Sequence, residues 1–417
     1  MRAEGGDAGN GTAAGGAARI YRERCDRLAA ARERMRRRSR IVGHARLAVF
    51  VAGALALTWL LTAASPAERE RAGALVLALL VAFVLLAFHH DRVKRLVRWS
   101  EELWVINDEG AQRAAHEWSA LPVHDPFVPP GSHPFAADLD LFGRASVSQL
   151  LGPVGTHAGL VTVRRWLLEP APPNEIAARQ EAVRELAPLA DVRDELAANG
   201  RVHQLTHAGG ASGFLEWAEE EPWLHRRRWL VATVYAIPAL TLAAIVLRAL
   251  GVVDAPVWAI PVVLAGLLTA AFRGRTSETL DRASGGYGAL RSSSGAFRLL
   301  SRHPFRSARL RDLQRALGTG DGAAHLEVRR LERLSVLADS RLSMFHLPIQ
   351  LLVLWDFHVT LAFERWQRRA GARARAWLDA LGEAEALASL AALAHDNPDW
   401  AFPEVVEGVA SRLEARS

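Results

Sequence analysis

The chain has 417 residues, half of them hydrophobic, and a formal net charge of +6. Its hydrophobic residues gather in long runs between arginine-rich stretches, which argues against one large soluble domain and favours a membrane protein. Because Cys25 is the only cysteine, neither an intrachain disulfide nor a cysteine-based zinc site can form.

The N-terminal part is predicted as a disordered tail followed by a basic helix. Residues 1–18 are mostly glycine and alanine, with too few large apolar side chains to build a packed structure. Residues 19–40 combine strong helix formers with many arginines. We therefore expect 19–40 to be a basic cytoplasmic helix that leads into the first membrane segment.

Four apolar runs are each close to the ~20 residues that a helix needs to cross a bilayer. They are Leu47–Ala64, Ala72–Phe88, Trp229–Leu247 and Val252–Phe272, and Asp254 is their only charged residue. The alternative is a set of buried soluble helices, but such helices rarely stay apolar on every face for this length. The runs predict two transmembrane hairpins, at 41–90 and at 229–273.

The orientation follows from the arginines beside these runs. Basic clusters precede the first and third runs, follow the second and fourth, and contain Arg36–Arg38, Arg92–Arg95, Arg226–Arg228 and Arg273–Arg275. The positive-inside rule places these ends, the bulk of the chain and both termini in the cytoplasm, with the protein in the plasma (inner) membrane. A secretory signal fits less well, because the first apolar run starts too late.

A fifth apolar run, Met344–Phe363, is predicted as a buried helix of the soluble body. It contains His346, Gln350 and Asp356, and a charged side chain within a bilayer is costly.

The remaining sequence predicts an all-α cytoplasmic body, because it has no sustained β alternation. Residues 91–133 read as a cytoplasmic helix and a proline-rich linker, and 134–228 as short helices separated by prolines and glycines. Long helices are expected at Thr276–Leu317 and Ala323–Ala394, on either side of the glycine-rich turn Gly318–Gly322. A strand is expected to begin within Trp400–Val406.

Two stretches of this body resemble the core domain of the MutS family of mismatch-repair ATPases. The first runs from Asp138-Leu139-Asp140 through Thr156-His157-Ala158-Gly159 and Arg164-Arg165-Trp166-Leu167-Leu168-Glu169-Pro170 to Ile176 and Arg179. The second is Glu385-Ala386-Leu387-Ala388-Ser389-Leu390-Ala391, followed by Phe402-Pro403-Glu404-Val405-Val406. The residues that carry the likeness are Asp138, Asp140, Thr156, Gly159, Arg164, Trp166, Leu167, Pro170, Arg179, Leu387, Ser389 and Leu390.

The resemblance implies a multi-helical MutS core-like body, residues 134–228 and 274–398, in a little-characterised membrane-anchored branch of that family. It also implies that 399–417 begin an ATPase domain that is truncated here, so that ATP and Mg²⁺ are expected only for the missing domain. Double-stranded DNA and a second copy of the chain are the partners it suggests. The N-terminal mismatch-reading domain of that family, with its Phe-x-Glu wedge, is replaced by a membrane hairpin, so a repair role does not follow.

The chain itself is predicted to be no enzyme and to bind no cofactor or metal. A phosphate-binding P-loop needs Gly-Lys-Ser/Thr, and the only lysine, Lys94, follows Val93 at a membrane boundary. His203 and His207 have the spacing of metal ligands on one helix face but no carboxylate partner, so surface histidines are the better interpretation.

Nucleic-acid contact is assigned to one arginine cluster, made of Arg302, Arg306, Arg309, Arg311 and Arg315. Phosphates are attracted to such a face. The alternative is pairing with carboxylates of neighbouring helices, which favours a membrane scaffold for protein partners with no DNA role.

Overall fold

The computed structural model describes residues 10–123, 127–129, 131, 133–204, 211–285, 287–342 and 346–405. Every regular element in these ranges is helical, which confirms the all-α class. Residues Trp400–Val405, where a strand was expected, form no regular element, and Val406 lies outside the described residues. The chain divides into two compact units. Unit 1 contains residues 1–153 and 392–401, and unit 2 contains 154–391 and 402–417.

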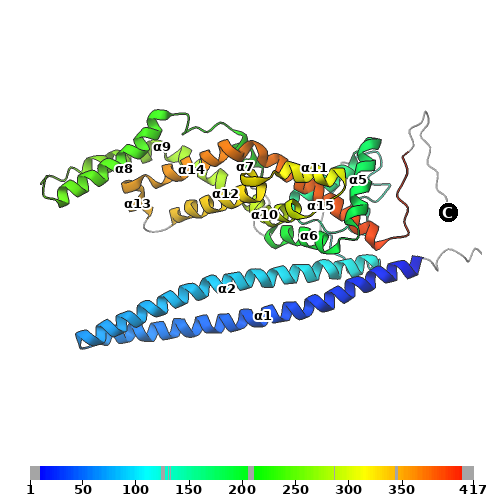
Figure 1. Cartoon of the computed structure of the whole chain (residues 1–417), viewed down its shortest axis with the longest axis horizontal. Helices are drawn as coiled ribbons and strands as arrows, with labels where there is room; N and C mark the ends of the chain where they lie inside the picture. Colours follow the sequence, from blue (N-terminus) through cyan, green and yellow to red (C-terminus); the bar gives the residue numbers. More distant parts are fainter. Residues whose placement is uncertain are drawn as a thin grey trace, which may run out of the picture. The chain divides into compact units, whose positions relative to one another are not determined.

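Unit 1 is built on a long helical hairpin. Helix α1 (Asn10–Thr62) and helix α2 (Pro66–Ala114) run side by side (Figure 1). The turn between them ends at Ser65, whose hydroxyl accepts a hydrogen bond from the Glu68 amide while the Glu68 carboxylate accepts one from the Ser65 amide. This capping box, with Pro66 at the first helical position, makes α2 begin where it does.

Helix α1 is longer than the sequence pattern indicated. Residues 10–18, expected in a disordered tail, are helical, and residues 1–9 lie outside the described part. The reason is packing: Ala17, Ala18 and Tyr21 form a buried cluster with Ala111 and Ala114 of α2. Residues 19–40 and 91–114 are likewise not separate helices, because each continues a hairpin helix without a break.

Within unit 1, a buried polar contact lies at the end of the hairpin where α1 begins and α2 ends. Asp396, 1% exposed, accepts hydrogen bonds from Arg113 Nε and from the Tyr21 hydroxyl, each at 2.7 Å. Between Ala115 and Pro153 the described residues form only one short helix, α3 (Val147–Leu150). The described part of the proline-rich segment 122–134 accordingly contains no helix or strand.

Unit 2 is a bundle of helices. Its elements are α4 (His157–Leu168), α5 (Pro173–Leu186), α6 (Ala190–Gln204), α7 (Ala211–Glu219), α8 (Arg228–Ala249), α9 (Ala259–Gly285), α10 (Tyr287–Arg302), α11 (Ala308–Leu317), α12 (Ala324–Asp339), α13 (His346–Val353), α14 (Trp355–Ala370) and α15 (Ala374–Asp396), whose last residues belong to unit 1. Prolines delimit α4 and α5 as their sequence predicts. The two long helices expected at 276–317 and 323–394 are instead divided into several shorter ones.

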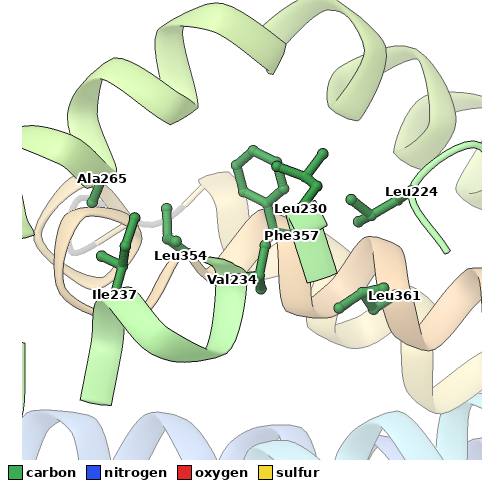
Figure 2. Packing of buried hydrophobic residues seen from close by; sticks show 8 residues of the cluster. All are labelled: Leu224, Leu230, Val234, Ile237, Ala265, Leu354, Phe357 and Leu361. Atoms are coloured by element: carbon green, nitrogen blue, oxygen red, sulfur yellow. The ribbon is translucent and has the colours of Figure 1, made fainter. Parts of the chain in front are cut away.

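The structure contradicts the single buried helix expected for the fifth apolar run, Met344–Phe363. Leu354 adopts a left-handed conformation with φ of 52°, and α13 and α14 meet there at a bend of 75°. Beyond the bend, Leu354, Phe357 and Leu361 are buried against Leu230, Val234, Ile237 and Ala265 of α8 and α9 (Figure 2). Before it, Gln350 is buried but Leu347 remains 64% exposed, so the apolar residues of α13 lie largely outside the core.

Three helices among the described residues are long and apolar enough to cross a membrane: α1 from Gly15, α2, and α8. In the most apolar stretch of α1, and in that of α2, only 6% is buried within the structure. Helix α9 does not meet the same test, because it starts only at Ala259 and turns polar at Arg273. The helices α13 and α14–α15 are long and apolar enough to cross a membrane only when the bent pair is counted as one span.

Candidate functional site

Residues 154–179 and 385–391 come together within unit 2. Thr156 caps α4, and its hydroxyl accepts a hydrogen bond from the Gly159 amide at 3.2 Å. The same hydroxyl donates to Glu385 Oε2 of α15 at 2.6 Å, and the Thr156 amide donates to that oxygen at 3.1 Å. A threonine of the first stretch and a glutamate of the second, 229 positions apart, therefore share a buried polar contact.

Glycine makes this close approach of the helices feasible. A Cβ atom on Gly159 would lie 2.2 Å from Glu385 Oε2, and one on Gly155 would lie 2.5 Å from the Ala197 carbonyl oxygen of α6. Larger residues at these positions would push α4 away from α15 and α6. Gly159 is thus needed for the packing of α4 on α15.

Glu385 is a buried acid without a cationic partner in its described contacts. Burial raises the pKa of its carboxyl to about 7, although the hydrogen bonds from Thr156 lower it. Its Oε1 atom is buried, and a hydrogen bond from the Gly155 backbone also lowers this pKa. Burial therefore favours the protonated carboxyl and keeps it protonated to a higher pH than an exposed glutamate.

Further contacts join the remaining motif residues of unit 2. The Arg179 guanidinium lies over the Trp166 ring, 3.8 Å from its centroid, and also pairs with Glu175. On the same helix, Gln180 donates to the Pro403 carbonyl oxygen at 2.7 Å, and Arg184 lies over the Phe402 ring. The segment after the second stretch therefore packs on α5, which belongs to the first.

The other family-motif residues have structural positions. Arg164 and Leu167 are half-buried on α4, and Pro170 lies just after that helix ends. Leu387 and Ser389 are fully buried in α15, whereas Leu390 is half-buried. Asp138 and Asp140 lie exposed in unit 1, outside this junction.

The predicted arginine cluster divides into paired and unpaired members. Arg309 forms a bidentate ion pair with Glu383, and Arg315 pairs with Asp312 of its own helix. Arg302, Arg306 and Arg311 are exposed, and the described residues give their side chains no ion pair. The backbone amides of Arg306 and Ser307 are held by Glu185, which fixes the start of α11. Three of the five arginines thus remain accessible to a phosphate.

Two surface pockets lie elsewhere in unit 2. One, of about 710 Å³, opens where α8 begins and is lined by Glu221, Pro222, His225, Arg226, Arg228, Val231 and Arg368. The other, of about 550 Å³, lies among α9, α12, α13 and α14 and contains the Asp356 carboxylate between Arg341 and His346. Sequence reasoning missed both, because their residues come from helices far apart in the chain. A cluster of arginines on both α8 and α14 was the only available signal.

Metal binding finds no support among the described residues, which contain no group of three metal-ligating side chains. The His203 side chain and His207 lie outside the described part. Cys25 is a half-buried thiol whose sulfur donates to the Trp104 carbonyl oxygen at 3.9 Å.

No protein-family model matches this sequence, and neither a curated protein nor a solved structure is significantly similar to it.

Proposed function

We propose that this chain is a membrane-anchored, MutS-like core module. The observation that supports it is the contact between Thr156 and Glu385. The two stretches were related to one family by sequence alone, and in a core of that kind they belong to one packed unit. Their meeting in unit 2, with Phe402 and Pro403 packed on α5, is what that relation requires.

The anchor of this module is the α1–α2 hairpin, with α8 and the apolar half of α9 as a second hairpin. Leu55, Leu61, Leu77 and Leu85 each expose more than half of their surface along α1 and α2. In water such a surface would be costly, whereas a bilayer covers it without a protein partner. Alkaline carbonate should leave the protein in the membrane pellet, and its release into the supernatant would reject the anchor.

The helical body faces the cytoplasm in this proposal and has two tasks there. It transmits the nucleotide state of an ATPase domain outside these residues, and it touches double-stranded DNA through Arg302, Arg306 and Arg311. Contacts made only by charge give weak, salt-sensitive binding that is indifferent to base sequence and to mismatches. A homodimer formed through the body is part of the same proposal.

The DNA contact is tested with detergent-solubilised protein and matched and mismatched duplexes at low and physiological salt. We expect similar affinity for both duplexes, and equal loss for both when Arg302, Arg306 and Arg311 are replaced by glutamine. The matched control is Arg309→Gln with Arg315→Gln, two arginines already paired with carboxylates. A tenfold preference for the mismatch, about 1.4 kcal/mol, would instead restore a repair role.

The competing function is a scaffold for protein partners without a DNA role. It is favoured by the number of arginines that are already paired: Arg369 and Arg330 with Glu327, Arg375 with Glu219, and Arg309 with Glu383. Absence of duplex binding even at low salt would select the scaffold.

A further inference from the structure

The pocket at the start of α8 is lined by arginines in excess of carboxylates and by two apolar residues, Pro222 and Val231. Three arginines line it against a single glutamate, and Arg226 pairs with that glutamate, Glu221. Arg228 and Arg368 are exposed and have no ion pair within the described residues. Two positive charges therefore face the same space from two different helices. Val231 also lines the pocket and packs against the buried cluster shared by α8, α9 and α14.

Hydrogen bonds hold the backbone before α8 against α14. The Glu364 carboxylate of α14 accepts hydrogen bonds from the Leu224 and His225 amides at 2.7 and 2.6 Å. Gln367, one turn further along α14, donates to the Glu220 carbonyl oxygen at 2.7 Å. The loop before α8 is thus fixed to the helix that carries Arg368. The backbone segments that carry the arginines therefore need no rearrangement when a ligand binds.

His225 is a neutral wall of this pocket. Burial lowers the pKa of its imidazole, and Arg368 and Arg365 lower it further. Its Nδ1 atom is buried and has no hydrogen-bond partner in the described structure. The ring therefore lines the pocket without adding charge, next to arginines that suit a phosphate.

The position of the pocket identifies its ligand. It lies at the end of α8, which is long and apolar enough to cross a membrane, and Trp229 is 60% exposed immediately after Arg228. Exposed tryptophan at such an end suits the interface between headgroups and acyl chains. At the membrane interface, a phosphate that is joined to apolar chains is the headgroup phosphate of a phospholipid.

We propose that this pocket binds the phosphate of an anionic phospholipid headgroup, with Arg228 and Arg368 as the residues that bind it. The inference rests on the membrane anchoring proposed above. An acidic lipid with a small headgroup, such as phosphatidylglycerol, matches two unpaired arginines, because the one lining carboxylate, Glu221, is already paired with Arg226. Zwitterionic phosphatidylcholine matches less well, because its trimethylammonium group would meet the same arginines.

The test is native mass spectrometry of the full chain in detergent, titrated with phosphatidylglycerol or phosphatidylcholine of equal acyl length. We expect one phosphatidylglycerol to be retained at least tenfold more tightly than phosphatidylcholine. Arg228→Gln with Arg368→Gln should remove this preference, and Arg368→Gln alone should weaken it about threefold. The matched control is Arg273→Gln with Arg275→Gln, which removes the same charge from the other basic end of the α8–α9 pair. If the control variant also lost the preference, the proposed pocket would be rejected. The preference would then come from the general attraction between basic residues and anionic headgroups.

Two competitors distinguish the source of the phosphate. Millimolar inorganic phosphate and a short DNA duplex should leave the bound phosphatidylglycerol in place, and displacement by either would overturn the proposal. A protein that stays in the carbonate pellet but shows no lipid preference would refute this inference alone. A protein that carbonate releases would refute the membrane anchor itself.

Discussion

Arg113 and Asp396 form an ion pair of 2.7 Å across 283 positions of the chain, with 4% and 1% of their side chains exposed. The Tyr21 hydroxyl donates to the second oxygen of the same carboxylate. Helix α2, the start of α1 and the end of α15 thus share one buried polar network in unit 1. A buried ion pair is not by itself a strong source of stability, but breaking one partner leaves a charge without compensation.

Replacing one partner of this pair should therefore cost much more than replacing both. We expect Asp396→Ala to lower the free energy of unfolding by about 3–5 kcal/mol, because Arg113 stays buried and charged. The double variant Arg113→Met with Asp396→Leu should recover most of that loss. Thermal unfolding of the detergent-solubilised protein measures both.

The control is the exposed pair of Arg40 and Glu33 on α1, where 67% and 63% of the side chains face solvent. Glu33→Ala should change stability by less than about 1 kcal/mol. A loss in the double variant equal to that in Asp396→Ala would contradict the network.

Glu385 should make the stability of unit 2 depend on pH. The folded-state pKa of about 7 lies above the ordinary value of 4.5, so the protonated carboxyl is favoured by folding. Stability is then full below about pH 4.5 and falls as the pH rises through 7, by about 3 kcal/mol in total. Glu385→Gln should flatten this dependence between pH 5 and 8 and raise the melting temperature at pH 8.

Glu383→Gln, two positions away on α15, is the matched control. It removes the ion pair with Arg309 and should lower stability at every pH in this range without changing the slope. If Glu385→Gln keeps the slope of the unaltered protein, another group is responsible for the titration.

The lone cysteine allows a direct test of orientation. With Cys25 replaced by serine, Ala64→Cys in the exposed turn between α1 and α2 should react with a membrane-impermeant maleimide in intact cells. Ala120→Cys, exposed after α2, should react only after permeabilisation. Labelling of both in intact cells, or of neither, would refute the proposed topology.

Residues 1–417 should show no saturable binding of a labelled ATP analogue at micromolar concentration. Lys94, the only lysine, lies within α2 and follows Val93, so it cannot serve the phosphates of a P-loop. Fluorescence titration with the purified chain measures this. Saturation by the analogue, reversed by unlabelled ATP, would contradict the prediction.

Local features of the chain were readable from the sequence because they depend on neighbours. The apolar runs predicted α1, α2 and α8 as helices of membrane-spanning length, and Pro170, Pro172 and Pro173 predicted the break between α4 and α5. The fourth run was less clear, because Pro256 and Asp254 shorten its helix to start at Ala259. The resemblance of two short stretches was also visible, since it rests on residue identity alone.

Only the tertiary structure decided the rest. The helix at residues 10–18 forms because Ala17 and Ala18 pack on α2, and the bend at Leu354 divides an apolar run whose composition is uniform. The contact of Thr156 with Glu385, and the pocket shared by Arg228 and Arg368, join positions separated by well over a hundred residues. Sequence patterns report periodicity over a few helical turns. Which buried acid or exposed arginine meets which partner depends instead on how the helices pack.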